Sequence, residues 1–217
     1  MRLILVRHGE TEHNKGGMTL GRFDAPLNEH GLAQAKAVAT SFGRPPEAIY
    51  ASPLKRALYT AELIGAETGV AVSVDDDLIE MDVGEMEHLS LTQLRELHPE
   101  FLRAWGSAEA ADARMPGGET LAEVQERAWS AVQRMHAAHR YTEVVAVTHN
   151  FVILTIVCRA IGLPLSDFRR LRQALAAKTI LEFHEHGQTL LQLNDNSHLI
   201  AAGLGDDVSP PPRGTAR

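Results

Sequence analysis

The sequence predicts an α/β fold, with helices on both faces of a central sheet. Short apolar runs alternate with longer amphipathic stretches along the chain, and this alternation is typical of α/β proteins. Two runs, residues 3–6 (LILV) and 144–147 (VVAV), are apolar at every position, as expected of strands buried on both faces of a sheet. With 217 residues and 44% hydrophobic side chains the chain can form one sizeable core, so we expect a single domain over residues 1–201.

The first part of the chain is predicted to form three strands and two helices. The loop after the first strand is polar and rich in glycine, and the first helix carries apolar side chains at helical spacing until Gly43 precedes two prolines. Ser52 is expected to cap the second helix, with Pro53 at its first position. In chain order, these elements are a strand at 3–6, a helix at 28–43, a strand at 48–51, a helix from 52 whose apolar stripe runs from 54 to 64, and a strand around 70–74.

The second part of the chain contains a less regular segment followed by further helices and strands. Residues 81–118 are expected to form an insertion that covers the functional site, with one helix beginning at Ser90 and another around Phe101. The tail at 202–217 is rich in proline and poor in apolar side chains, so we expect it to be disordered. The remaining elements are predicted to be a helix at 119–140, a strand at 144–147, a helix at 149–161 and a hairpin with strands at 179–183 and 189–193.

Composition and charge argue against several classes of function. The net charge of -7 and the pI near 5.9 disfavour nucleic-acid or anionic-membrane binding, since both surfaces attract a basic face. No apolar run reaches the roughly 20 residues that a membrane-spanning helix needs, and the first residues do not resemble a signal peptide, so we expect a cytoplasmic protein. The single cysteine, Cys158, permits no internal disulfide and is expected to pack in the core. No sequence feature indicates an oligomeric state.

Basic side chains follow three of the predicted strands at the point where each strand ends. Arg7 and His8 come directly after the first strand. Arg56 follows the second strand at the start of a helix, and His149 follows the strand at 144–147. Because ligands in α/β sheets bind beyond the carboxyl ends of the strands, we expect these side chains to share one site. Their charge suits an anion such as a phosphate group.

These basic residues belong to a series of short motifs distributed along the chain. The first, Arg7-His8-Gly9-Glu10-Thr11, has odds of roughly one in ten thousand of occurring by accident in a chain of this length. The others are Gly21-Arg22-Phe23-Asp24, Ser52-Pro53-Leu54-Lys55-Arg56-Ala57, Leu78-Ile79-Glu80, Pro116-Gly117-Gly118-Glu119-Thr120, Arg127, Val147-Thr148-His149 and a closing Leu193-Asn194-Asp195 with His198-Leu199. Through these motifs the chain resembles the histidine phosphatase superfamily, in its phosphoglycerate mutase-like branch, over residues 1–199.

The resemblance implies a more specific fold and activity. It implies a three-layer α/β/α sandwich around a mostly parallel sheet with one antiparallel strand, which the apolar pattern alone does not give. It also implies phosphoryl chemistry on small phosphorylated metabolites with no cofactor and no metal, because arginines and histidines supply the positive charge that magnesium provides in other phosphoryl-transfer enzymes. The chain resembles the shorter phosphatase type of the family more than its mutases, whose middle insertion is longer.

The expected nucleophile is His8, whose neutral imidazole nitrogen would attack phosphorus and form a phosphohistidine. Arg7 and Arg56 would clamp the phosphate oxygens with paired guanidinium donors. The two arginines would also disfavour the imidazolium form of His8 and so keep the ring neutral near pH 7.

Three further residues complete the predicted site. By the resemblance, His149 stabilises the transferred group, Asn14 is an extra phosphate donor, and Glu80 is the general acid that protonates the leaving group and then activates water. A bound phosphate would raise the pKa of Glu80 by charge repulsion, which keeps its proton available. Taken alone, Arg56, Glu80 or Asn14 would more often be a solvated surface residue. Their occurrence together with two histidines, in the order of the family, favours catalysis.

The sequence departs from the family pattern at two places near the expected site. His88 stands where the family usually has glycine, and Asn150-Phe151 occupy two positions where glycines are common. Side chains at these positions would narrow or re-aim the substrate site, or change what is attached to the phosphate. We therefore expect substrate specificity to depend on Phe23, His88, Arg114 and Asn150.

The other histidines are expected to be surface residues. His184 and His186 share one face of a strand beside the hairpin turn, but no third metal ligand is evident near them in the sequence. His198 belongs to the closing motif, and the sequence assigns it no role. The remaining histidines in this group are His13, His30, His98, His136 and His139.

The sequence thus predicts a phosphomonoesterase that hydrolyses small phosphorylated metabolites through a phosphohistidine on His8. Candidate substrates are sugar phosphates, phosphoglycerates and nucleotide-like compounds such as α-ribazole phosphate. The alternatives are a phosphoglycerate mutase, a non-catalytic phospholigand-binding protein and a metal-dependent hydrolase. Retention of the nucleophile, the arginines and the acid argues against a protein that only binds, and activity that survives a chelator would argue against a metal-dependent enzyme.

Overall fold

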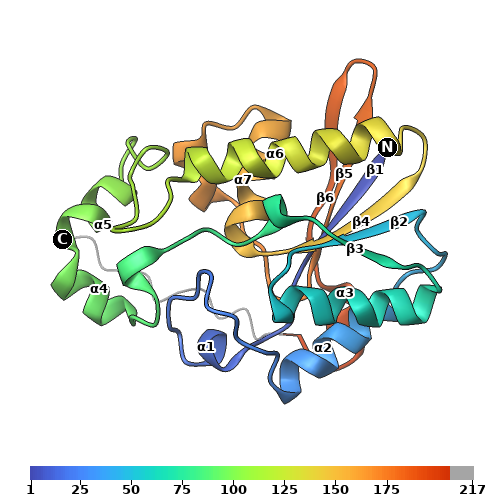
Figure 1. Cartoon of the computed structure of the whole chain (residues 1–217), viewed down its shortest axis with the longest axis horizontal. Coiled ribbons are helices and arrows are strands. Elements are labelled where there is room, and N and C mark those ends of the chain that lie inside the picture. Colours follow the sequence, from blue (N-terminus) through green and yellow to red (C-terminus); the bar gives the residue numbers. More distant parts are fainter. Residues whose placement is uncertain (206–217) are drawn as a thin grey trace.

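The computed structural model describes residues 1–205 and shows a six-stranded sheet between two layers of helices (Figure 1). The strands are β1 (Arg2–Arg7), β2 (Ala48–Ala51), β3 (Val72–Val74), β4 (Glu143–Thr148), β5 (Lys178–His184) and β6 (Gly187–Asp195). Their order in the sheet is β3-β2-β4-β1-β5-β6. The pairs β3-β2, β2-β4 and β4-β1 are parallel, whereas β5 runs antiparallel to both β1 and β6. Within the described sheet β5 alone runs against the others, which confirms the predicted mostly parallel sandwich.

The helices match most of the predicted ones within a few residues. Their bounds are α1 (Glu12–Lys15), α2 (Glu29–Ala39), α3 (Lys55–Thr68), α4 (Leu91–Leu97), α5 (Pro99–Trp105), α6 (Leu121–Ala138), α7 (Asn150–Ile161) and α8 (Ser197–Ala201). α2 begins where predicted, because the side chain of Asn28 accepts the N–H of Gly31 at 2.8 Å and caps the first turn. None of the helices between residues 1 and 205 is long and apolar enough to cross a membrane.

The apolar runs of the sequence are strands buried on both faces, as predicted. Side chains alternate between the two faces of a strand. In β1, Leu3 and Leu5 pack in a cluster with residues of α6 and α7, whereas Ile4 and Val6 pack in a second cluster with residues of α2 and α3. Each face of the sheet therefore has its own core, and the polar chemistry is left to the ends of the strands.

The start of α3 differs from the prediction. The helix begins at Lys55 with Leu54 as its N-cap residue, and no side chain caps it. The predicted cap, Ser52, is buried, and its hydroxyl lies 2.7 Å from Nε2 of His149 instead. The prediction that Ser52 caps the helix is wrong, because His149, from a distant part of the chain, bonds the hydroxyl that would have acted as the cap.

The pattern of the sequence does not predict the short helices α1 and α8. α1 follows a capping box in which Thr11 and Asn14 bond to each other's backbone N–H groups. After α8, the N–H of Leu204 donates to the carbonyl of Leu199 at 2.8 Å, and the Leu204 side chain packs against the core. The chain therefore remains packed past residue 202, where the predicted tail begins. Residues 206–217, the rest of that tail, lie outside the described residues.

Residues 81–118 form the predicted insertion between β3 and α6 and contain α4 and α5. The first part of the insertion belongs to the main core, since Met81, Val83 and Met86 are buried among the residues that pack under α6 and α7. α4 and α5 extend away from the sheet on the side where α1 lies (Figure 1), and a β-bridge between Met18 and Ser90 ties them to the loop after α1.

Candidate active site

The carboxyl ends of β1, β2 and β4 bring together the residues that the sequence indicates as catalytic. Arg7 is the last residue of β1 and His8 follows it, while His149 follows β4 and is the N-cap residue of α7. Arg56 lies in the first turn of α3, beyond β2. The ring centroids of His8 and His149 are 5.1 Å apart. We call Arg7, His8, Arg56, Glu80 and His149 the charged cluster.

His8 is held in the tautomer that a nucleophile requires. Its side chain is 3% exposed, and Nδ1 lies 2.7 Å from the carbonyl oxygen of Gly9. A carbonyl only accepts hydrogen bonds, so we assign the proton to Nδ1, which leaves the lone pair of the neutral ring on Nε2. Burial, followed by the nearby charges of Arg56 and Arg7, lowers the pKa of His8 well below its ordinary value of 6.5. The ring is therefore a neutral base near pH 7.

His149 is a second neutral imidazole beside the first. Burial, followed by Arg56 and His8, lowers the pKa of His149 well below its ordinary value. Its Nε2 lies 2.7 Å from the hydroxyl of Ser52, a buried residue that sequence reasoning placed only as a helix cap. Its Nδ1 is buried and has no hydrogen-bond partner among residues 1–205. Buried polar atoms are rarely left unpaired, so this nitrogen marks a place for a ligand.

Arg56 is a fully buried cation at the base of the site. One terminal nitrogen donates to the carbonyl of Phe23 at 2.8 Å and the other to the carbonyl of Gly21 at 2.6 Å. Its Nε is buried and unpaired within the described residues. Burial lowers the pKa of Arg56, while Glu80, Glu87 and Asp24 raise it. An arginine remains protonated in proteins, so the site holds a buried positive charge and an unused donor.

Arg7 and Asn14 are the two other predicted phosphate ligands, and the described side-chain hydrogen bonds of Asn14 are with Thr11 and not with the charged cluster. Nη1 of Arg7 donates to the carbonyl of Gln173 at 2.6 Å, which fixes the direction of its guanidinium. The side-chain oxygen of Asn14 accepts from the backbone N–H and the hydroxyl of Thr11. The oxygen is thus used by the capping box, and the amide NH₂ is the group of Asn14 that can donate to a ligand.

Glu80 is a buried carboxyl group with the properties of a proton donor. It is 4% exposed, and burial raises its pKa above the ordinary value of 4.5. A hydrogen bond from the N–H of Met81 to Oε1, at 2.8 Å, and the charges of Arg56, Arg7 and Arg127 partly oppose this rise. Oε2 lies 3.5 Å from the N–H of Phe151, in the first turn of α7. A carboxyl group with a raised pKa retains its proton at a higher pH.

Arg127 and Glu119 support the segment that carries Glu80. The guanidinium of Arg127, on α6, donates to the carbonyls of Asp77, Ile79 and Glu80 and to the carboxylate of Glu119. Both residues occur in the sequence motifs, but nothing in the sequence shows which backbone they hold. Their contacts fix the backbone that carries the Glu80 carboxyl group.

Of the four residues expected to control specificity, only some lie together. Phe23 and His88 are in contact, with ring centroids 4.6 Å apart. His13 joins them, because its Nε2 lies 2.9 Å from Nδ1 of His88. Phe23 also adjoins the charged cluster, because its carbonyl accepts from Arg56.

His88 has a φ of 66°, in the region that favours glycine, which accounts for the glycine of the family pattern.

Asn150 begins α7 next to His149. Arg114 is exposed and bonds to the carboxylate of Glu123 and the carbonyl of Gly118. Its described contacts hold the insertion, and none of them reaches the charged cluster.

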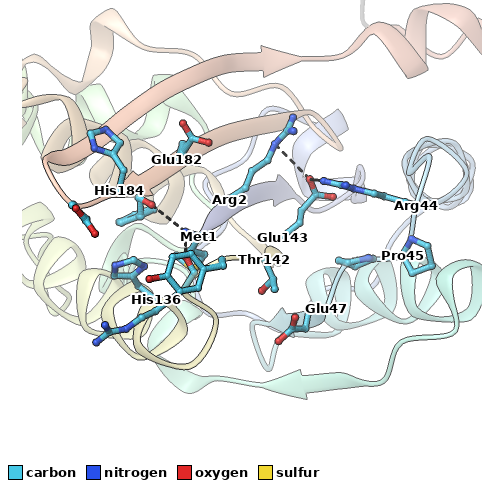
Figure 2. Close-up of a pocket in the computed structure, with 15 residues that line it drawn as sticks. Met1, Arg2, Arg44, Pro45, Glu47, His136, Thr142, Glu143, Glu182 and His184 are labelled. Atoms are coloured by element: carbon cyan, nitrogen blue, oxygen red, sulfur yellow. Dashed lines mark hydrogen bonds and ion pairs between the residues drawn. The ribbon is translucent and has the colours of Figure 1, made fainter.

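A hollow of about 1270 Å³ lies at the opposite ends of the strands. Figure 2 shows its lining residues, which include Met1 and Arg2 at the start of β1 and Glu143 at the start of β4. No residue of the charged cluster lines it.

His136 at its wall is half-buried, and the neighbouring His139 bonds to Glu47 and Tyr50, so the prediction that these two histidines are solvated is wrong. Residues 1–205 contain no group of three His, Cys, Asp or Glu side chains arranged to hold a metal ion.

Comparisons with known proteins agree with this geometry. The family model described as the histidine phosphatase superfamily (branch 1) matches residues 3–196. The chain is 33% identical over 200 residues to phosphoserine phosphatase 1 of Hydrogenobacter thermophilus, covering 92% of this chain and 94% of that one. It is 33% identical over 208 residues to the metal-independent phosphoserine phosphatase of Arabidopsis thaliana, covering 93% of this chain and 84% of that one. Among solved structures, mycobacterial glucosyl-3-phosphoglycerate phosphatase superposes with a TM-score of 0.81 at 31% identity, covering 89% of this chain and 98% of that one.

Proposed function

This chain belongs to the histidine phosphatase superfamily, and from that membership we propose that it hydrolyses phosphomonoesters through a phosphohistidine formed on His8. It is a phosphoric monoester hydrolase that acts on small phosphorylated metabolites. The observation that carries the mechanism is the neutral, buried His8, with its lone pair on Nε2, close enough to Arg56 and Arg7 for their charges to lower its pKa. The unpaired Nε of Arg56 and Nδ1 of His149 are the donors that a phosphate would satisfy.

The first step of the proposed reaction is attack by Nε2 of His8 on phosphorus. A bond from nitrogen to phosphorus forms as the ester bond from phosphorus to oxygen breaks, and Glu80 gives its proton to the departing oxygen. Arg7 and Arg56 bind the equatorial phosphate oxygens, and His149 hydrogen-bonds the transferred group, so that the developing charge is met by donors already in place.

The second step returns the enzyme to its starting state. Glu80, now a carboxylate, takes a proton from water, and the water oxygen attacks phosphorus as the bond to His8 breaks. The products are the alcohol released in the first step and inorganic phosphate. Splitting one difficult displacement into two easier ones is the advantage of a covalent intermediate.

The two pKa shifts make the required protonation states compatible. With their ordinary pKa values of 6.5 and 4.5, a neutral His8 would need a pH above 6.5 and a protonated Glu80 a pH below 4.5. The structure lowers the pKa of His8 and raises that of Glu80, so the two windows move toward each other. We expect a bell-shaped dependence of kcat/KM on pH, with an acid limb from His8 and an alkaline limb from Glu80.

Glu80→Gln is expected to reduce kcat by about 10²–10⁴-fold for alkyl phosphates, because an alkoxide leaves only if it is protonated. The loss should be much smaller for p-nitrophenyl phosphate, whose phenolate leaves without help. Steady-state kinetics on both substrates give the comparison. Glu85→Gln, which alters an exposed carboxylate in the same segment, is the matched control. Equal losses on both substrates would contradict the role of Glu80 as general acid.

The substrate is proposed to be a small metabolite that carries a second polar group near the phosphate. Two of the similar proteins are named for phosphoserine and one for glucosyl-3-phosphoglycerate. In this chain Phe23 and His88, with His13 behind them, offer an aromatic face and imidazole nitrogens next to Arg56. Such a surface suits the carboxylate of an amino acid or sugar acid.

The proposed function is tested by hydrolysis in the presence of excess chelator. We expect undiminished turnover of p-nitrophenyl phosphate, and faster turnover of at least one member of a panel containing O-phosphoserine, 3-phosphoglycerate and sugar phosphates. His88→Gly should change the order of the panel and leave p-nitrophenyl phosphate unchanged. Activity that disappears with the chelator would contradict metal-independent hydrolysis. Interconversion of phosphoglycerates without release of phosphate would identify a mutase.

A further inference from the structure

We propose that His198 is a positioning residue for the reaction and acts on His8 through residues 173–177, which we call the strap. The inference rests on the proposed role of His8 as the nucleophile. His198 lies in α8, near the end of the described chain, and its described hydrogen bond goes to the carbonyl of Ala176. Its influence on the site is therefore indirect.

The strap holds both catalytic residues of the first motif. The N–H of Ala176 donates to the carbonyl of His8 at 3.1 Å, and the N–H of Arg7 donates to the carbonyl of Ala177 at 3.2 Å. The carbonyl of Gln173 accepts from Nη1 of Arg7 at 2.6 Å. The strap thus fixes the backbone on both sides of the nucleophile and the direction of one phosphate-binding guanidinium.

The strap needs support from outside, because its backbone is strained at Ala176. This buried alanine has a φ of 51°, a conformation that residues other than glycine rarely adopt. Such a residue keeps its conformation only where its surroundings hold it there. Nε2 of His198 lies 2.9 Å from the carbonyl of Ala176 and is the side-chain donor to that peptide group.

The end of β6 supplies a second support. The side-chain oxygen of Asn194 accepts the N–H of Ala174 at 2.6 Å, and Asn194 itself has a φ of 56°. The side chain of Gln173 donates to the carbonyl of Ala177 at 2.8 Å and accepts from the hydroxyl of Thr179 at 2.6 Å. The closing motif of the sequence, which contains Asn194 and His198, thus acts on the strap.

The surroundings of His198 favour its neutral form with the proton on Nε2. The carbonyl of Ala176 requires a donor, and Nδ1 is buried without a hydrogen-bond partner among residues 1–205. A proton on Nδ1 would therefore have no acceptor. Burial lowers the pKa of His198, and the charge of Lys178 lowers it further, while the hydrogen bond to the Ala176 carbonyl and the charge of Asp195 oppose this shift. A glutamine can present an N–H at the same place and is therefore the conservative replacement.

The test compares His198→Leu, which removes the donor, with His198→Gln, which keeps it. We expect His198→Leu to lower kcat on p-nitrophenyl phosphate by about 10- to 100-fold with little change in KM, since small displacements of a reacting group have effects of this size. A looser His8 would also be less buried, so its pKa, followed by NMR of the imidazole, should rise toward 6.5. His198→Gln should restore both values to near those of the native chain.

Met135→Ala controls for loss of stability. Met135, near the end of α6, is buried in the core cluster on one face of the sheet, whereas Ala176 of the strap belongs to the cluster on the other face. It should lower Tm and leave kcat and the pKa of His8 unchanged. If His198→Leu does not fold, Asn194→Gly removes the other support while keeping a backbone that suits glycine, and should shift the pKa in the same direction.

Two results would overturn the proposal. One is an unchanged pKa of His8 in His198→Leu, or in Asn194→Gly if that variant is used. The other is an equal change in Met135→Ala at the same loss of Tm, which would make the role of His198 merely structural. The NMR titration needs no turnover, so failure of the proposed function, seen as activity that survives His8→Ala, is distinguishable from failure of this inference.

Discussion

Replacement of His8 by alanine is expected to abolish measurable turnover, with kcat falling by about 10⁶-fold. The expectation follows from the covalent mechanism, because His8 is the histidine of the charged cluster whose Nε2 lone pair is left for phosphorus when Nδ1 bonds the Gly9 carbonyl. His149 is neutral as well, but its Nε2 is bonded to Ser52. Removal of the nucleophile leaves the phosphate-binding donors intact, so the variant should still bind inorganic phosphate.

The measurement is hydrolysis of p-nitrophenyl phosphate with calorimetric titration of inorganic phosphate on the same samples. His184→Ala is the matched control, because His184 is an exposed histidine on the β5-β6 hairpin, and it should keep full activity. Turnover by His8→Ala within tenfold of the native rate would contradict covalent catalysis at this residue. Loss of phosphate binding together with turnover would mean that the substitution has collapsed the site.

Arg56→Lys is expected to give the second largest effect, a fall in kcat/KM of about 10³-fold or more. The guanidinium bonds the carbonyls of Gly21 and Phe23 and still has Nε unpaired within the described residues. A lysine ammonium is a point charge without this planar fork, so it cannot hold the loop and present a further directed donor at once. The charge is kept, so the loss reports geometry more than electrostatics.

Kinetics and thermal unfolding of Arg56→Lys should be measured together, because the residue is fully buried. Arg103→Lys, at a position where the arginine side chain is 78% exposed, is the control and should leave both quantities unchanged. A lysine variant with kcat/KM within tenfold of the native chain would show that Arg56 is not a directed phosphate ligand. If the Arg56→Lys variant is unfolded at the assay temperature, both chains would be assayed at a lower temperature at which the variant is folded.

The centre of the sheet was predictable because two of its strands, β1 and β4, contain continuous apolar runs with strong local signals. Strands at 3–6 and 144–147 can be buried only inside a sheet, and helices with apolar stripes must cover it. The edge at which Arg7, His8 and His149 meet then follows from the rule that ligands bind beyond the carboxyl ends of strands. The presence of one antiparallel strand was implied by the family resemblance alone, and only the structure identifies that strand as β5, since local sequence carries no information on strand order.

The supporting contacts were not predictable, because they join residues far apart in the sequence. Ser52 has the local features of a helix cap, yet its partner is His149, 97 residues away. The bond from Arg7 to Gln173 spans 166 residues. No periodicity or motif records such a pair, so sequence reasoning indicated the groups proposed to carry the chemistry and missed the contacts that hold them.

The specificity residues illustrate the same limit of local reasoning. The sequence indicated His88 as a specificity residue because it replaces the glycine of the family pattern, and its positive φ explains why glycine suits that position. Its neighbour His13 has no such signal in the sequence, and only the fold brings the two imidazoles within hydrogen-bond distance. Arg114 has the charge expected of a substrate ligand, but an acidic partner on α6, Glu123, binds it instead.

Trapping of the covalent intermediate tests the central claim most directly. The native chain would be mixed with p-nitrophenyl phosphate, quenched with alkali within a turnover and digested for mass spectrometry, because a bond from phosphorus to imidazole nitrogen survives alkali and hydrolyses in acid. The account predicts one phosphoryl group, located on His8, and none in His8→Ala. A phosphoryl group on another residue, or turnover with none on any residue at times shorter than one catalytic cycle, would contradict it.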